Sequence, residues 1–222
     1  MVVGKMIFGL KNFKNGPSSL RGILCMLGGA LSLTINDAMA KYLTQSYPVG
    51  QVMALRGLSI ILLLIAFLFF MNNLQALKIF SWKGHLLRAG AMTGSTFFFI
   101  TGLSLLPITD AIAIAFVAPI LTTILGVIIL REAVSWKRWA AIFVGFFGVI
   151  IILQPTSDAF KIAAIAPMGA AAFGAARDVI TRAISGSENS LSILFTSMLM
   201  ITIAGFLTYP LGWSAVNPSH IW

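Results

Sequence analysis

Two acid–base pairs lie within otherwise apolar stretches of this 222-residue sequence. Asp37 precedes Lys41 by four residues, and Asp178 precedes Arg182 by the same interval. In a helix, side chains four residues apart lie on one face. A charged side chain inside a membrane-spanning helix is costly and generally faces a cavity or a partner. Charges of opposite sign in such places can neutralise the two ends of an amphoteric molecule, or gate its path.

Three further polar residues accompany the two pairs. Asn36 directly precedes one acid, Arg177 directly precedes the other, and Arg56 lies inside the next apolar stretch. An alternative role, strongest for Lys41 and Arg182 near helix ends, is to anchor the helices by reaching the membrane surface. The residues that we predict to bind substrate or gate its path are Asn36, Asp37, Lys41, Arg56, Arg177, Asp178 and Arg182.

Composition requires that membrane helices position these residues. Hydrophobic residues make up 59% of the sequence and charged residues 9%, against about 25% charged in soluble domains. The mean hydropathy is +0.97, and a spanning helix needs about 20 apolar residues. The sequence therefore predicts an all-α, polytopic membrane helix bundle. Its predicted spans are 22–43, 51–71, 86–106, 108–130, 139–153 (starting near Trp136), 162–184 and 191–213.

The fourth stretch, 108–130, has two features with local explanations. Pro119 lies in its middle, where a missing backbone N–H and a bulky ring predict a helix kink. Thr109 and Asp110 follow Pro107 at the start, which is typical of an N-cap. We therefore expect one kinked helix, capped by these side chains.

Basic residues lie on alternate sides of the predicted spans. They precede the first span and lie between spans two and three and between spans four and five, whereas the intervening connections are nearly free of them. Because lysine and arginine are concentrated on the cytoplasmic side, we expect a cytoplasmic N-terminus in a cell (inner) membrane. Residues 1–21 would then form a basic cytoplasmic segment. The residues counted are Lys5, Lys11, Lys14, Arg21, Lys78, Lys83, Arg88, Arg131, Lys137 and Arg138.

A shift of 141 residues superimposes the first span on the sixth. Gly28 then meets Gly169, and the Asn-Asp pair at 36–37 meets the Arg-Asp pair at 177–178. Five helices separate the two copies, and because five is odd the second copy must cross the membrane in the opposite sense. We therefore expect a first five-helix repeat over 22–153 and the start of an inverted repeat over 162–222.

Several short motifs, in order along the chain, resemble a known family. The segments are 36–41 (Asn-Asp-Ala-Met-Ala-Lys), 55–57 (Leu-Arg-Gly), 107–114, 118–120, 131–132 (Arg-Glu), 136–142 and 145–150 (Gly-Phe-Phe-Gly-Val-Ile). Together they resemble an EamA-type member of the drug/metabolite transporter superfamily. The resemblance implies ten helices in two inverted repeats, with alternating access to a central cavity. Here the second repeat shows two helices of the expected five, as in a truncated sequence, a degraded copy or a chain that pairs with another.

These observations favour a carrier of a small polar or zwitterionic metabolite. Mixed charges suit amino acids, and the 36–41 motif also resembles S-adenosylmethionine carriers. A non-transporting remnant or assembly partner is an alternative, as is a membrane-embedded enzyme. We expect no enzyme, metal or cofactor, because Cys25 is the single cysteine and no nucleophile or metal-ligand motif is present. We expect no nucleic-acid partner, because the net charge of +9 is spread between apolar stretches; the unfinished repeat suggests a homo-oligomer.

Overall fold

The computed structural model describes residues 18–71, 74–154, 162–186 and 188–215. The chain divides into two compact units, Met1–Met39 and Ala40–Trp222, which we describe separately. Within the described ranges the regular elements are all helical, and no strand is present. The prediction of an all-α bundle is therefore confirmed.

The first unit contains most of the first predicted span. Helix α2 runs from Ser18 to Leu43 and crosses the boundary between the units at its C-terminal end. Asn36 and Asp37 belong to the first unit, whereas Lys41 belongs to the second.

The second unit contains the remaining helices. Their bounds are α3 Val49–Phe70, η2 Leu74–Leu77, α4 Trp82–Leu105, α5 Ile108–Ala115, α6 Ala118–Leu130, α7 Trp136–Leu153, η4 Ile162–Ala164, α8 Ile165–Ile184, α9 Ser190–Phe206 and η5 Tyr209–Leu211. Helix α7 begins at Trp136 as expected. The last predicted span is not one continuous helix, since α9 ends at Phe206 and the short η5, which contains Pro210, follows it.

The structure gives the form of the kink predicted in the stretch 108–130. The helix is interrupted at Phe116 and Val117, between α5 and α6. Pro119 explains the interruption, because its missing N–H would have bonded to the carbonyl of Ala115, the last residue of α5. The cap prediction needs correction: Pro107 holds the N-cap, and Asp110 lies fully buried in the first turn of α5.

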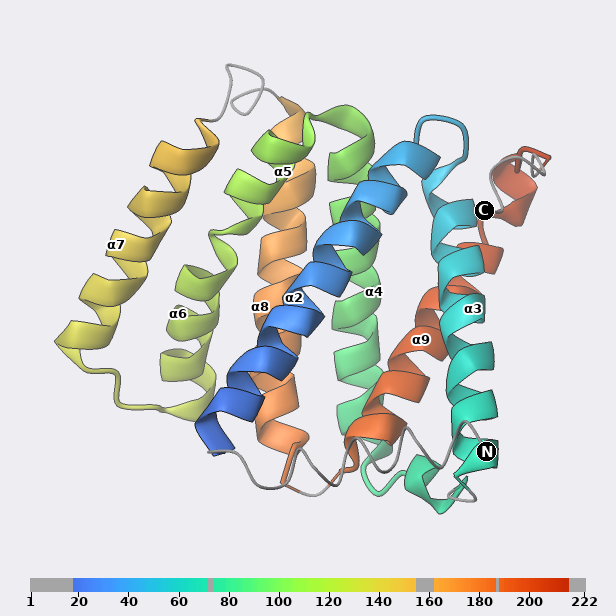
Figure 1. The fold of residues 1–222 in the computed structure, drawn as a ribbon, viewed down its shortest axis with the longest axis horizontal. Helices are drawn as coiled ribbons and strands as arrows, with labels where there is room; N and C mark the ends of the chain where they lie inside the picture. The colour runs from blue at the N-terminus through green and yellow to red at the C-terminus, as the bar shows by residue number, and fades with distance from the viewer. Residues whose placement is uncertain (1–17, 72–73, 155–161, 187, 216–222) are drawn as a thin grey trace. The chain divides into compact units, whose positions relative to one another are not determined.

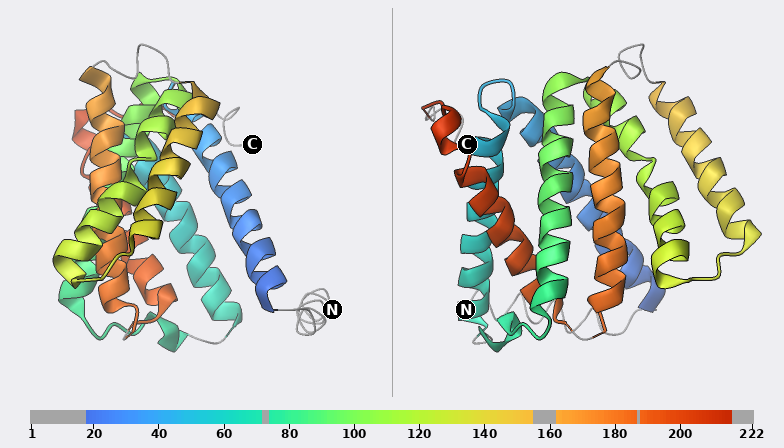
Figure 2. Two further views of the ribbon diagram at one scale, coloured as in Figure 1. Left: turned by 90° about the vertical axis from the view of Figure 1, so that its left-hand side faces the viewer. Right: turned by 180° about the vertical axis from the view of Figure 1, so that it is seen from behind.

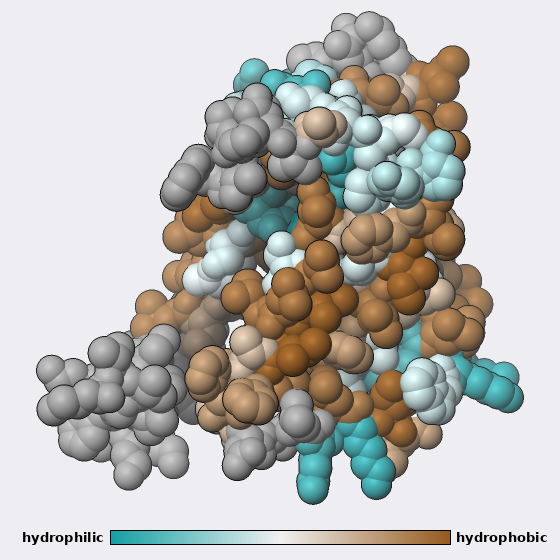
Figure 3. Space-filling view, turned by 90° about the vertical axis from the view of Figure 1, so that its right-hand side faces the viewer, coloured by the Kyte–Doolittle hydropathy of each residue, from teal (hydrophilic) through white to brown (hydrophobic). Residues whose placement is uncertain are grey.

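Among the residues that the structure describes, five helical stretches are long and apolar enough to cross a membrane. They are Gly22–Leu43, Val49–Phe70, Ile108–Leu130, Ile162–Ile184 and Ser190–Leu211. The middle of the face on which α3 lies is largely apolar, with hydrophilic side chains toward both its upper and lower ends (Figure 3). Phe69 and Phe70 on that helix are 71% and 86% exposed. Such exposure is unfavourable in water and natural in lipid, so the protein is an integral membrane protein.

Helix α4 lies at the centre of the second unit. It packs against α8 on one side and α9 on the other; α3 packs on α9, and α6 packs on α8 (Figures 1 and 2). Helix α7 contacts α5 and α6. Because α4 runs between two apolar helices, and its 24 residues measure about 36 Å, we assign it the same path across the membrane.

Small residues allow α3 and α9 to approach closely. A Cβ placed on Gly205 of α9 would lie 2.6 Å from the backbone N of Ala54 and 2.7 Å from the carbonyl oxygen of Gly50. The backbones therefore touch at this crossing, as is common for glycine-mediated packing in membranes. Gly90, which belongs to a Gly-x-x-x-Gly motif in α4, has no such neighbour: among the described residues, nothing would lie within 4 Å of a Cβ placed there.

Candidate functional site

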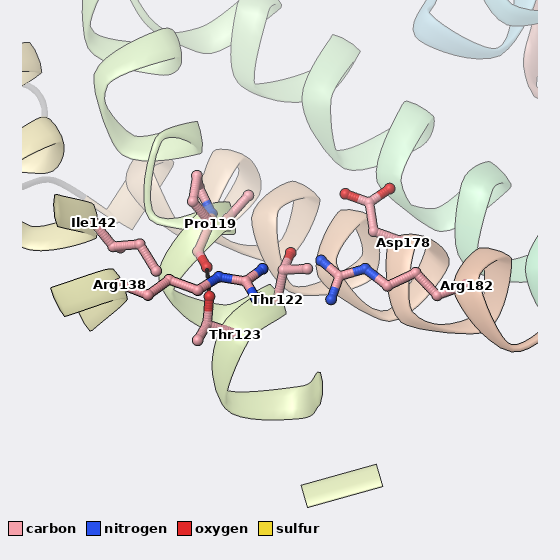
Figure 4. Close-up of a pocket in the computed structure, with 8 residues that line it drawn as sticks. Pro119, Thr122, Thr123, Arg138, Ile142, Asp178 and Arg182 are labelled. Carbon is pink, nitrogen blue, oxygen red and sulfur yellow. Dashed lines mark hydrogen bonds between the residues drawn. The ribbon is translucent and has the colours of Figure 1, made fainter. Parts of the chain in front are cut away.

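A polar cavity of about 330 Å³ lies between α6, α7 and α8 (Figure 4). Its lining combines an acid, two bases and two hydroxyls with apolar side chains. The lining residues are Ala118, Pro119, Thr122, Thr123, Arg138, Ile142, Asp178 and Arg182. Two of the seven predicted site residues, Asp178 and Arg182, are therefore brought to one cavity, and the helix break at Pro119 forms part of its wall.

Local structure explains how each side chain reaches the cavity. Thr122 and Thr123 lie one turn beyond the break, in the first half of α6. Arg138 is in the first turn of α7, and Asp178 and Arg182 lie one turn apart on α8. In Figure 4 the guanidinium groups of Arg138 and Arg182 approach Thr122 from opposite sides.

Asp178 is held by its neighbour in the sequence. Its Oδ1 accepts hydrogen bonds from Arg177 at 2.9 Å (Nε) and 2.7 Å (Nη2). The Arg177 Nη1 also lies 3.5 Å from the sulfur of Met92 on α4. The carboxylate nevertheless remains 44% exposed, so its second oxygen can meet a cation that enters the cavity.

Arg182 connects α8 to the segment after α6. Its Nη1 lies 3.1 Å from Oε2 of Glu132, and both side chains are about one-third exposed. Glu132 reaches this position after Arg131, which adopts a left-handed conformation and ends α6. Glu132 belongs to the Arg-Glu motif at 131–132, and the structure pairs it with a cavity residue on α8.

Lys41 and Arg56 are not among the residues that line this cavity. The Lys41 ammonium donates to the carbonyls of Leu103 and Leu106, the latter at 2.8 Å, where α4 ends. Terminal helix carbonyls lack intrahelical partners and attract cations, so Lys41 caps α4. Arg56 borders a small space of about 20 Å³ that also has three methionines in its wall: Met53, Met92 and Met198. Asn36 and Asp37 lie in the first unit and stay predictions.

Sequence reasoning missed the role of Arg88. We counted it as a topology marker, but its guanidinium donates to Thr181 Oγ1 of α8 at 2.7 Å and to Ser197 Oγ of α9 at 2.5 Å. One side chain of α4 thereby joins both neighbouring helices. The available signal was its position three residues inside the apolar stretch 86–106, where a charge needs a partner.

A second contact that the sequence did not predict joins His85 to Glu188. Their side chains lie 3.0 Å apart and are almost completely buried. Elsewhere in the described chain, no group of three or more His, Cys, Asp or Glu side chains converges as a metal site would require.

Comparison with known proteins supplies the family. Residues 20–154 match the model of the EamA-like transporter family. The riboflavin transporter of Vibrio cholerae is 28% identical over 213 residues, 91% of this chain and 69% of the relative. The S-adenosylmethionine uptake transporter of Rickettsia prowazekii is 31% identical over 181 residues, 82% of this chain and 61% of the relative. That of Rickettsia bellii is 33% identical, covering 82% and 62%.

No solved structure matches the chain. The chain spans about six- to seven-tenths of the length of these curated relatives. The family match covers more than half of the chain and confirms the resemblance noted in the motifs. The relatives of this chain are named as transporters, which agrees with the prediction that the protein is not an enzyme. The chain belongs to the EamA-like transporter family.

Proposed function

We propose that this protein is a carrier of a small amphoteric metabolite, which binds in the cavity between α6, α7 and α8. The observation that carries the proposal is the charge pattern of the lining, with Asp178 and Arg182 on α8 and Arg138 across from them on α7 (Figure 4). The arginines would hold a carboxylate, and Asp178 would hold an ammonium or sulfonium group. Hydrogen bonds to charged groups contribute about 1.5–3 kcal/mol each, enough to orient a small zwitterion.

Two substrate chemistries occur in the names of the relatives, and the cavity favours one of them. Riboflavin is uncharged at neutral pH, whereas S-adenosylmethionine and amino acids carry charges of both signs. The lining offers both signs of charge, from Asp178 and from Arg138 and Arg182. We therefore propose a substrate like S-adenosylmethionine or an amino acid rather than a flavin.

The expected inverted repeat suggests how the substrate would cross the membrane. If 22–153 and 162–222 are related by a pseudo-twofold, the pair Asp37 and Lys41 corresponds to Asp178 and Arg182 at the opposite mouth. With a cytoplasmic N-terminus, the Asp178 cavity faces the cytoplasm and the Asp37 pair faces outward. Asn36 and Arg56 would belong to the outer mouth, and alternating access would expose the two pairs in turn.

Binding of tritiated S-adenosylmethionine to the purified chain, followed by uptake into proteoliposomes, tests the proposal. Asp178→Asn keeps the size of the side chain but removes its charge, and we expect at least about tenfold weaker binding, equivalent to about 1.4 kcal/mol. Lys83→Gln serves as the control, because it removes a charge from an exposed position on α4 outside the cavity.

Competition with unlabelled riboflavin and amino acids then defines the substrate class. Displacement by riboflavin but not by any amphoteric compound would refute the substrate assignment. Equal binding by wild type, Asp178→Asn and Lys83→Gln would refute the assignment of this cavity.

A further inference from the structure

A buried histidine–glutamate pair joins the start of α4 to the connection between α8 and α9. His85 is the fourth residue of α4, and Glu188 lies in the connection. They are 2% and 8% exposed, and Nε2 of His85 lies 3.0 Å from Oε2 of Glu188. No cavity residue of the proposed carrier site takes part in this pair, so it calls for a separate explanation.

The surroundings of Glu188 favour an ionised carboxylate. The backbone N–H of Phe80 lies 3.1 Å from Oε1, and that of Ser81 lies 2.5 Å from the same atom. These donors precede the first turn of α4, where N–H groups lack helical partners and favour negative charge. Glu188 therefore holds the beginning of α4 from another part of the chain.

The contacts of both ring nitrogens of His85 favour one more proton than a neutral ring carries. Its Nδ1 lies 2.8 Å from Oγ1 of Thr196. That hydroxyl lies 2.9 Å from the carbonyl of Ser192 and 3.2 Å from that of Ile193, to which it gives its single hydrogen. A hydroxyl that donates to those carbonyls accepts from Nδ1–H, when the ring carries its hydrogen on that nitrogen. Nε2 lies 3.0 Å from the carboxylate, in an ion-pair contact without hydrogen-bond geometry. Because a ring lone pair would be repelled at that distance, we infer that Nε2 carries a proton as well.

Charge balance supports the same conclusion. A carboxylate removed from water is costly unless a cation is beside it. Helix α9 contains no Asp, Glu, Lys or Arg, and Arg88 on α4 is bonded to Thr181 and Ser197. A protonated His85 would be the cation in contact with Glu188. The charged residues on the elements around the pair are Lys78, Lys83 and Arg88, with Arg56 on α3 and Arg177, Asp178 and Arg182 on α8.

We propose that His85 and Glu188 form a binding site for one proton, and that this proton ties the α8–α9 connection to the start of α4. When the proton leaves, Nε2 presents a lone pair to the carboxylate, and the contact becomes repulsive. The connection would then separate from Phe80 and Ser81. The proposal does not depend on which substrate the protein carries.

Nitrogen NMR of the imidazole ring tests the proton directly. The chain has two histidines, so His220→Asn leaves His85 as the single reporter in the full chain. Below the pH at which the ring loses its proton, both ring nitrogens should carry hydrogen. Above it, the hydrogen that remains should be on Nδ1, bonded to Thr196. A neutral ring with its hydrogen on Nε2 would mean that Thr196 donates to Nδ1 and that no extra proton is held, which overturns the proposal.

Amide hydrogen exchange tests the tie in the same sample. We expect the protection of the Ser81 amide, corrected for the intrinsic effect of pH, to fall at least about tenfold as His85 loses its proton, equivalent to about 1.4 kcal/mol. The buried Ile100 amide in the same helix should be unaffected. Glu188→Gln should leave Ser81 poorly protected at every pH. Unchanged Ser81 protection across the titration would overturn the tie, and this measurement needs no variant of the pair itself.

Discussion

The crossing of α3 and α9 gives a prediction whose size follows from the structure. In Gly205→Ala, the new methyl group would lie 2.6 Å from the backbone N of Ala54 and 2.8 Å from its Cα. Since carbon contacts are ordinarily about 3.5–4.0 Å long, the helices must separate by about 1 Å. The clash is with backbone on the facing helix, so no side-chain rotation can relieve it.

The expected loss of stability is about 2 kcal/mol. Overpacking costs about 1–3 kcal/mol, and we take the upper part of this range because backbone is involved. Replacing a helical glycine with alanine returns about 0.5–1 kcal/mol. A net 2 kcal/mol is about a thirtyfold change in the unfolding equilibrium constant.

Gly90→Ala is the matched control for this substitution. It makes the same chemical change in α4, where nothing described lies within 4 Å of the added methyl, so it should be neutral or slightly stabilising. Both variants can be unfolded with SDS in mixed micelles and followed by tryptophan fluorescence. Equal midpoints for Gly205→Ala and wild type, or an equal loss in the Gly90→Ala variant, would refute the close-contact argument.

Two further predictions concern charged residues. Lys41→Met removes the cation that caps α4, so it should lower stability by about 1 kcal/mol; an SDS midpoint equal to that of wild type would contradict the capping role. Burial acts to raise the pKa of Glu188, but the contacts with His85 and with the N–H groups of Phe80 and Ser81 outweigh it and hold the pKa below its ordinary value. The stabilisation by Glu188 is therefore present above the ordinary carboxyl pKa and is lost as the pH falls through the lowered pKa of Glu188. The SDS midpoints of wild type and Glu188→Gln should thus converge on acidification. A difference between the two midpoints that does not change with pH would contradict this prediction.

The close approach of α3 and α9 also shows where sequence reasoning lost information. Glycines occur in several helices, and Gly90 belongs to a Gly-x-x-x-Gly motif of the kind that lets membrane helices pack closely. The structure puts the backbone contact at Gly205 instead. A glycine permits close approach, but only the crossing geometry of two helices determines whether a neighbour occupies that space.

The positions of the charged residues could also be predicted only in part. Their spacing alone predicted that Asp178 and Arg182 lie on one face of a helix, one turn apart. Arg138 could not be added to them, since it enters the cavity from α7, a helix that contacts α5 and α6. The role of Lys41 depends on carbonyls 62 and 65 residues away.

The sequence by itself determined that the protein is a bundle of membrane helices, where most of those helices begin and end, and to which family it belongs. These properties depend on composition within windows of about 20 residues, because bilayer thickness sets the length of a span. Only the tertiary structure decided that Lys41 caps α4, that Arg88 joins three helices, and that His85 meets Glu188. Those outcomes depend on contacts between residues distant in sequence, since a polar group buried among helices must find its partner wherever packing places one.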